Sequence, residues 1–98
     1  MKLNVYSAYD AKSELFMSPF MAVNDGTAVR LFGGVVRDSN TLVGQYPDDF
    51  QLFHLATFDD KTGAYESIAP AKLIVAASSL VGVLPTVSKK NEEDPKDA

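Results

Sequence analysis

The sequence contains no cysteine among its 98 residues. This absence excludes disulfide frameworks, thiolate zinc sites and cysteine nucleophiles, and it leaves the redox compartment open. Long hydrophobic runs are also missing, because the longest, LIVAASSLVGVL (73–84), has 12 residues and is too short to span a bilayer. The amino-terminal MKLNVYSAYD is interrupted by Asn4 and Ser7, which is atypical of a signal peptide. We therefore expect a soluble intracellular protein.

An excess of basic residues is lacking as well. Nine Lys and Arg stand against 13 Asp and Glu, for a formal net charge of −4. Since general affinity for nucleic acid comes mostly from Lys and Arg that neutralise phosphates, any DNA contact must depend on a local patch, on stacking or on a partner protein. The segment KKNEEDPKDA (89–98) mixes both charges with no apolar residue except its last. This composition predicts a disordered tail after a single domain at 1–88.

Signatures of catalysis and of metal or phosphate binding are not found in the sequence. FGGVV (32–36) has neither the spacing nor the Lys-Ser/Thr of a P-loop, and DDKTG (59–63) lacks the alternating ligands of an EF-hand. His54, the single histidine, has no nominated nucleophile or carboxylate partner and fits a structural role on a strand. Two acidic pairs bracket this strand and are typical of turns, Asp48-Asp49 and Asp59-Asp60. We expect no enzyme, no metal site and no cofactor.

Alternating residues and turn signals predict a small antiparallel sheet of about four strands. KLNVYSAY (2–9) alternates as a strand does, and LFM (15–17) returns against it before Pro19 ends the pairing. Residues 50–58 and the following AYESI form the strongest hairpin signal, with Gly63 at the left-handed position of the turn. The segment 71–84 has both helical spacing and β-branched residues, and we favour a second helix there.

One main helix is predicted over residues 25–38, with Asn24, Asp25 or Thr27 as its N-cap. Gly33 and Gly34 each cost about 1 kcal/mol relative to alanine in a helix interior, so they predict a kink, an early end or the close approach of another group. Apolar residues at helical spacing form the stripe that would pack on the sheet: Ala28, Leu31, Phe32, Val35 and Val36. The fold class is therefore α+β, with the helix on one sheet face.

The second sheet face also carries apolar residues, and we assign Tyr6 to it together with Phe53 and Leu55. Three covers are open: the segment 71–84, a second copy of the chain, or bases of single-stranded nucleic acid stacked on the aromatic rings. An apolar face with little charge more often meets protein. Phe53 and Leu55 are therefore predicted to form a homodimer interface.

Arg30 and Arg37 are the candidate cations for a nucleic-acid contact. They are seven residues apart on the helix face opposite the apolar stripe, with two glycines between them. Two guanidiniums beside bare backbone could clamp a phosphate strand or a partner's carboxylates, and the alternative is a pair of solvated arginines. Lys2 shares the parity of Tyr6. Arg30, Arg37, Lys2 and Tyr6 are the predicted nucleic-acid contacts.

Several blocks of the sequence resemble the nonstructural protein of gokushoviruses, small tailless phages of the microvirus family with circular single-stranded DNA genomes. These blocks occur in the same order: LNVYSAYDAK (3–12), PF (19–20), ND followed by AVRLF (24–32), and YPDDFQLFHLATFDDKTG (46–63). The resemblance covers about the first two thirds of the chain and fades beyond residue 70. Ala56 stands where the family pattern has glycine, so we expect no kink in the strand at that position.

The resemblance implies a phage-encoded protein of the infected bacterial cytoplasm that is absent from the mature capsid. Such proteins are described as DNA-binding, or as acting in the switch from duplex replication to single-strand synthesis and packaging, and no catalytic residue is carried over. We therefore favour a dimeric accessory protein that contacts single-stranded DNA. The alternative is a protein-interaction regulator that binds the replication initiator or host machinery without touching DNA, which the acidic composition favours.

Overall fold

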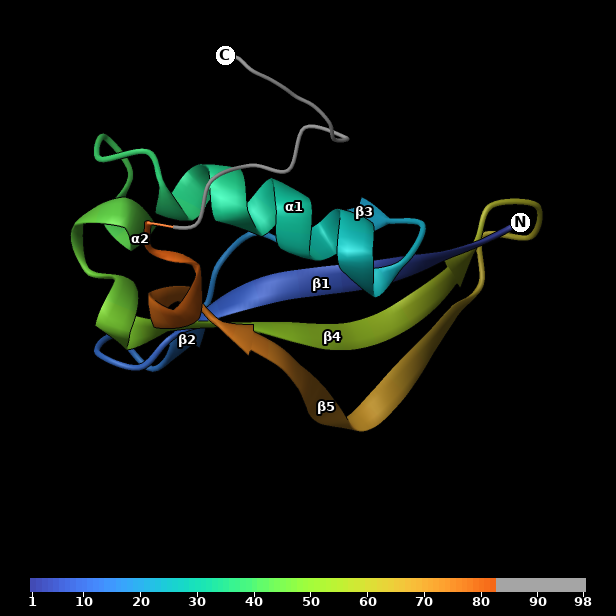
Figure 1. Ribbon diagram of the computed structural model, residues 1–98. Coiled ribbons are helices and arrows are strands. Elements are labelled where there is room, and N and C mark those ends of the chain that lie inside the picture. The colour runs from blue at the N-terminus through green and yellow to red at the C-terminus, as the bar shows by residue number, and fades with distance from the viewer. Residues whose placement is uncertain (83–98) are drawn as a thin grey trace, which may run out of the picture.

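The computed structural model describes residues 1–82 of the chain as an α+β fold (Figure 1). One main helix packs on an antiparallel sheet of five strands, so the predicted fold class is confirmed. The strands are β1 (Lys2–Asp10), β2 (Leu15–Phe16), β3 (Phe20–Ala22), β4 (Phe50–Asp59) and β5 (Tyr65–Ala76). The helical elements are α1 (Asp25–Val36), the short α2 (Leu42–Gln45), and the 3-10 turns η1 (Pro47–Asp49) and η2 (Ala77–Leu80).

β1 organises the sheet because it pairs with three other strands. The order is β2-β1-β4-β5, and β3 joins the same edge of β1 as β2, nearer the start of the strand. β1 and β4 pair along their whole length, from Lys2 opposite Asp59 to Asp10 opposite Phe50. The strand that begins at Leu15 ends before Pro19, as predicted, and the chain then returns to β1 at Phe20. This return supplies the strand that raises the predicted number from about four to five.

The hairpin of β4 and β5 confirms the turn prediction and corrects the prediction for the segment after it. Gly63 has a φ of 76°, a conformation that glycine adopts without steric cost. β5 then continues to Ala76 and is followed by η2, so the helix favoured from residue 71 is wrong over the described residues. Strand pairing wins here because it satisfies the edge of β4 while Ile74 and Val75 pack on the core. The predicted tail (89–98) and the end of the predicted helix lie outside the described residues.

The register of β4 contains a bulge at Leu55. Tyr6 of β1 pairs with His54, but Val5 pairs with Ala56, so Leu55 has no partner in the β1 ladder, and it has none in the β5 ladder either. A bulge of this kind inserts one extra residue and bends the strand. The expectation of an unkinked strand at Ala56 is therefore wrong, because alanine does not prevent the insertion.

The core lies between α1 and the sheet. Asn24 is the N-cap of α1, since its Oδ1 accepts a hydrogen bond from the Thr27 N–H at 2.8 Å. The helix then runs through both glycines without a break. Its inward residues meet inward residues of the strands and loops, and the resulting core comprises Tyr6, Ala8, Ala22, Ala28, Phe32, Val36, Val43, Phe50, Leu52 and Ala77. Leu31 and Val35, which were expected to pack on the sheet, are instead exposed by 52% and 39%.

Candidate functional site

Tyr6 lies beneath α1, on the covered face of the sheet. Its ring stacks between Phe20 at 5.7 Å and His54 at 4.9 Å, and no part of the residue is exposed. Its hydroxyl donates a hydrogen bond to Asp25 Oδ1 at 2.5 Å, at the start of α1. Burial raises the pKa of this hydroxyl well above its usual range, and the hydrogen bond and charge of Asp25 raise it further. Tyr6 is thus a packing residue with no ring face free for a base.

The placement of Tyr6 corrects the assignment of one sheet face to both Tyr6 and Phe53. The ladder sets Tyr6 opposite His54 and sets Ser7 opposite Phe53. Side chains of successive strand residues point to opposite faces, so Phe53 lies on the face away from α1. The sequence alone does not show which residue of β1 lies opposite Phe53, so it could not show which residues of β1 share a face with it.

His54 closes the bulge on the covered face. Its Nε2 lies 3.1 Å from the carbonyl oxygen of Ala56, and because a carbonyl only accepts, this nitrogen carries the proton. The ring also stacks on Tyr6. Through both contacts, His54 stabilises β4 next to the bulge at Leu55.

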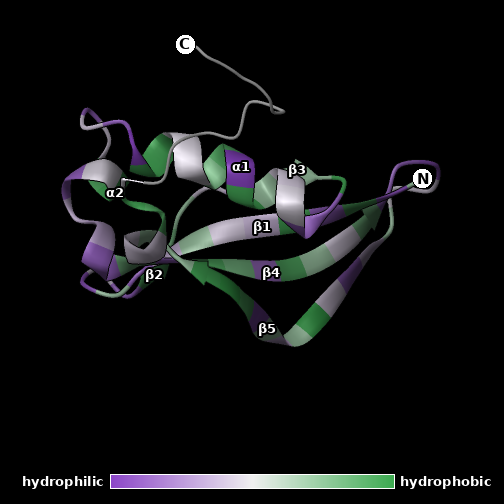
Figure 2. Ribbon diagram, in the orientation of Figure 1, coloured by the Kyte–Doolittle hydropathy of each residue, from purple (hydrophilic) through white to green (hydrophobic). Residues whose placement is uncertain are grey.

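The face of the sheet away from α1, here called the open sheet face, consists of uncharged residues. Tyr6 and Ala8 belong to the core, so the alternating residues of β1 and their ladder partners form the opposite face. Within residues 1–82 the ladder positions on this face are Leu3, Val5, Ser7, Tyr9, Phe16, Met21, Gln51, Phe53, Ala56, Phe58, Tyr65, Ser67, Leu73 and Ala76. The charged residues of the same strands, Lys2, Asp10, Asp59, Glu66 and Lys72, occupy ladder positions on the α1 side. Figure 2 shows hydrophobic residues along much of β4 and in the last part of β5.

Two groups of aromatic rings cover much of the open sheet face. Tyr9 and Phe16 have ring centroids 4.9 Å apart, and Phe53 meets Phe16 edge-on at 5.8 Å. At the other end, Phe58 and Tyr65 are 4.8 Å apart. Apart from Phe53, these rings were not singled out from the sequence, although the alternation of β1 contained the signal for Tyr9. Phe53 lies on this face as predicted, whereas Leu55 is the part-buried extra residue of the bulge.

Three large side chains on the open sheet face are exposed to water: Phe16 by 46%, Leu73 by 52% and Tyr65 by 63%. Ser7, in the middle of the same face, is fully buried, and its hydroxyl donates to the carbonyl oxygen of Met17. The centre of the face is therefore already well packed, and its periphery offers large apolar side chains.

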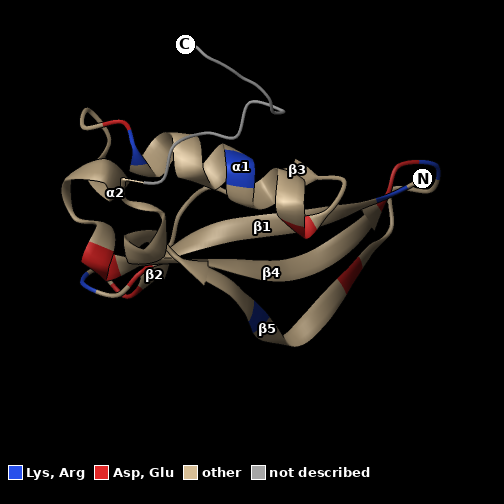
Figure 3. Cartoon of the chain, viewed as in Figure 1, with Lys and Arg blue, Asp and Glu red and all other residues tan. Residues whose placement is uncertain are grey.

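Arg30 lies in α1, and Arg37 follows its last residue as the C-cap. Figure 3 shows basic positions of the α1 region in blue. Arg30 is exposed, and Arg37 is half-buried. A Cβ atom on Gly33 would lie 2.9 Å from Nη1 of Arg37, so the guanidinium folds back over that glycine. The two salt bridges formed within residues 1–82 involve neither arginine. Gly33 is thus the place where another group comes close to the helix.

Lys2 does not join the two arginines. It begins β1, opposite Asp59, and its Nζ lies 4.0 Å from Glu66 Oε1. Nearby, the Met1 ammonium lies 2.8 Å from Asp60. The pKa of Asp59 is lowered, first by a hydrogen bond from the Lys61 backbone and also by the charges of the amino terminus and Lys2. The positive charge of Lys2 is therefore offset locally by carboxylates.

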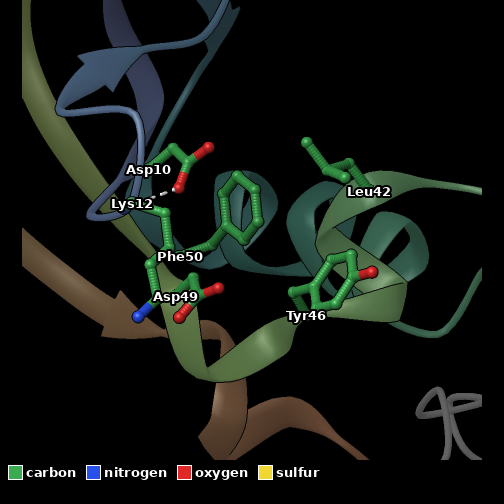
Figure 4. Close-up of a pocket in the computed structure, with 6 residues that line it drawn as sticks. All are labelled: Asp10, Lys12, Leu42, Tyr46, Asp49 and Phe50. Atoms are coloured by element: carbon green, nitrogen blue, oxygen red, sulfur yellow. Dashed lines mark hydrogen bonds between the residues drawn. The ribbon is translucent and has the colours of Figure 1, made fainter.

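A cavity of about 390 Å³ lies at the other end of the domain, between the β1–β2 turn and α2 (Figure 4). Leu42 and Tyr46 face the ring of Phe50 across it, and Asp10, Lys12 and Asp49 complete its lining. Asp10 Oδ1 accepts a hydrogen bond from the Lys12 backbone N–H at 2.9 Å. Across residues 1–82, no three His, Asp or Glu side chains gather as a metal site would require, and no helix has the length and apolar character of a membrane span.

Residues 3–80 match the family model described as Phage ORF5 protein. The chain belongs to this family. The match extends from β1 to η2, so the phage ORF5 family segment contains both the open sheet face and the arginines of α1. No curated protein and no solved structure matches the chain. The phage origin implied by the sequence resemblance is confirmed at the level of this family.

Proposed function

We propose that this phage protein is a nonstructural accessory protein of the gokushovirus type and that it binds single-stranded DNA through the outer surface of α1. In this role it acts without catalysis in the host bacterial cytoplasm, during synthesis or packaging of the genome. The observation that carries the proposal is the pair Arg30 and Arg37, which share one side of α1 and form no salt bridge within residues 1–82.

The geometry of α1 suits a contact with a phosphate backbone. Seven residues correspond to about 10.5 Å along a helix axis, so the two arginines follow a line nearly parallel to α1. The fold-back of Arg37 over Gly33 brings its guanidinium toward Arg30 along that line. Guanidinium groups present fixed pairs of donors that match phosphate oxygens, and they are weakly hydrated compared with ammonium groups.

The rest of the molecule limits how strong this contact can be. The chain has a net charge of −4, and Lys2 is offset by Glu66 and Asp59. Binding must therefore depend on a few local cations, and it should weaken as salt rises, with a shallow slope set by their small number.

The test is a salt series of binding to a labelled single-stranded oligonucleotide, measured by fluorescence anisotropy. Each neutralised phosphate contributes about −0.7 to the slope of log K against log salt for single strands, so Arg30→Ala with Arg37→Ala should flatten the slope by about 1.4. The matched control, Lys12→Ala with Lys61→Ala, removes the same charge from two exposed turns and should retain most of the wild-type slope.

Two results would contradict the proposal. One is the absence of measurable binding at low salt by wild-type protein whose circular dichroism shows it to be folded. The other is an equal loss of slope in the control variant, because equal losses would mean that overall charge and not the surface of α1 governs binding.

The second candidate function is a protein-interaction regulator that binds the replication initiator or host machinery without contacting DNA. The uncharged open sheet face favours it, since apolar faces of this kind are typical of protein contacts. This function predicts that oligonucleotide titrations stay flat, while the purified initiator of the same phage binds wild-type protein and not Leu73→Glu.

A further inference from the structure

The open sheet face has the properties of a surface that is covered in the working protein. Large apolar side chains are exposed at its periphery, with Leu73 at 52% and Tyr65 at 63%. Monomeric proteins rarely expose a broad apolar patch of this kind. The question is which occupant fits the charge, the size and the symmetry of the face.

Charge is the first criterion, and it favours an uncharged occupant. The ladder positions on this face hold no Lys, Arg, Asp or Glu in the described part of the chain. Bases of single-stranded DNA could stack on the rings of Phe16 and Tyr65, but a strand laid there would bring its phosphates to a face without cations, on a protein of net charge −4. An apolar protein surface needs no such neutralisation.

Size is the second criterion. β4 has ten residues, which correspond to a length of about 33 Å, and the three long strands β1, β4 and β5, about 4.8 Å apart, span about 14 Å. Their footprint is on the order of 450 Å², and the exposed side chains at its periphery, such as Leu73 and Tyr65, add accessible area. A standard protein interface buries about 800 Å² on each partner. The whole face, used at once, therefore falls at the small end of the range for specific contacts.

We propose that the open sheet face binds the same face of a second copy of the chain. The same patch on both copies then forms a two-fold interface, which is the commonest symmetry of soluble oligomers. Two copies of an uncharged face bring together no like charges, although each chain is acidic. The product is a four-layer dimer in which the two sheets pack face to face and the two α1 helices are outermost.

The test compares two variants that differ in face and match in chemistry. Leu73 on the open sheet face and Leu31 on the outer side of α1 are both 52% exposed. Sedimentation velocity over a micromolar concentration series should show a wild-type dimer, a Leu73→Glu monomer and an unchanged Leu31→Glu dimer. Phe16→Glu, on β2, provides a second way to charge the same face if Leu73→Glu does not fold.

Three results would overturn a dimer formed through the open sheet face. Wild-type protein that stays monomeric throughout the series would do so directly. Dissociation by Leu31→Glu but not by Leu73→Glu would assign the contact to the apolar groove beside α1, which is lined by Phe20, Leu31, Phe32 and Val35. If the wild-type protein is monomeric and Leu73→Glu binds oligonucleotide more weakly than wild type, the face binds bases and not a second copy.

The dimer also has a consequence that rests on the proposed DNA binding. With α1 outermost on both copies, the two pairs of Arg30 and Arg37 face in opposite directions, so one dimer can hold two strand segments. Energy transfer between two oligonucleotides, one labelled as donor and one as acceptor, should rise with wild-type protein. Leu73→Glu should bind each oligonucleotide without joining them. A wild-type dimer that binds DNA but gives no transfer would contradict this arrangement, whereas a dimer that binds no DNA would contradict only the proposed function.

Discussion

The two faces of the sheet use alternate residues of the same strands and yet end in different environments. On the α1 side, Leu52 is fully buried and Phe50 is 2% exposed. On the other side, Leu73 of the neighbouring strand is 52% exposed. Both faces carry large apolar side chains, so hydrophobic residues alone do not distinguish a core from a contact surface. What distinguishes these two is the position of α1.

Charge separates the faces as clearly as burial does. The charged strand residues, including Lys72 and Glu66, occupy positions on the α1 side, whereas the ladder positions on the opposite side are uncharged within residues 1–82. A face that simply met water would gain from polar side chains, because they keep their hydration. The open sheet face therefore resembles a second core surface, which is the property that the proposed dimer requires.

The largest expected effect comes from truncating one leucine on each face to alanine and comparing the two changes in the free energy of unfolding. Leu52→Ala should lower the free energy of unfolding by about 2–5 kcal/mol, since it leaves a cavity under α1. Leu73→Ala should change it by less than about 0.5 kcal/mol, provided that urea unfolding is measured at a concentration where the chain is monomeric. Similar costs for both variants would mean that the open sheet face is already covered within one chain.

The strands and the main helix could be predicted because each depends on local pattern. Residues 2–9 alternate, Gly63 marks the turn, and Asn24 begins the helix, as expected. The class of the fold followed from these signals. The identity of the residues on each face did not follow, because it depends on pairing between distant strands.

The register between β1 and β4 shows why the faces were mixed. Tyr6 pairs with His54, so the neighbouring Phe53 lies on the opposite face, and the bulge at Leu55 then moves Phe58 to the face of Phe53 although its number shares the parity of Leu52. The fold-back of Arg37 could not be predicted either, since it depends on the space that Gly33 leaves. The segment after Pro70 has both helical spacing and β-branched residues, so the sequence alone was ambiguous. It forms a strand because pairing with β4 satisfies the backbone groups at the edge of that strand.

The second-largest expected effect concerns the Tyr6 hydroxyl, which connects the sheet to the start of α1 by a hydrogen bond. Tyr6→Phe removes the hydrogen bond to Asp25, and hydrogen bonds to charged groups contribute about 1.5–3 kcal/mol. Because the ring remains, stacking with His54 is retained and the loss of unfolding free energy should stay within this range. Urea denaturation at neutral pH measures it, and a loss below about 0.5 kcal/mol would show that the hydroxyl is not needed to hold α1.

The same pair gives a pH dependence with a definite sign. The pKa of Tyr6 is raised in the folded state, so its contribution is complete below the ordinary tyrosine value of about 10 and is lost as the pH rises above that value. The stability difference between wild type and Tyr6→Phe should therefore shrink above about pH 10. A difference that stays constant up to pH 12 would contradict the raised pKa.

A smaller effect is expected at the start of α1. Asn24→Ala removes the side-chain acceptor of the Thr27 N–H, and the loss of such a cap costs about 1 kcal/mol. Asn40→Ala is the matched control, because the Asn40 bond to Asp38 uses the backbone N–H and survives the change. Thermal unfolding should show a lower midpoint for Asn24→Ala alone, and equal midpoints would mean that packing, not the cap, sets the start of the helix.

The smallest expected effect concerns the outer side of α1, where two adjacent glycines differ. A Cβ on Gly34 meets nothing within 4 Å, so Gly34→Ala should stabilise the fold by about 0.5–1 kcal/mol through helix propensity alone. A Cβ on Gly33 would push on the flexible end of Arg37, which can move aside, so Gly33→Ala should gain less stability and should displace the guanidinium from α1.

Urea unfolding and the oligonucleotide salt series, applied to both glycine variants, separate these two contributions. Gly34→Ala should leave the salt slope at its wild-type value, because it leaves the Arg37 guanidinium in place. Gly33→Ala should alter the slope while the protein stays folded. An unchanged slope in Gly33→Ala would mean that the fold-back of Arg37 serves the helix end and its partial negative charge, and not a bound strand.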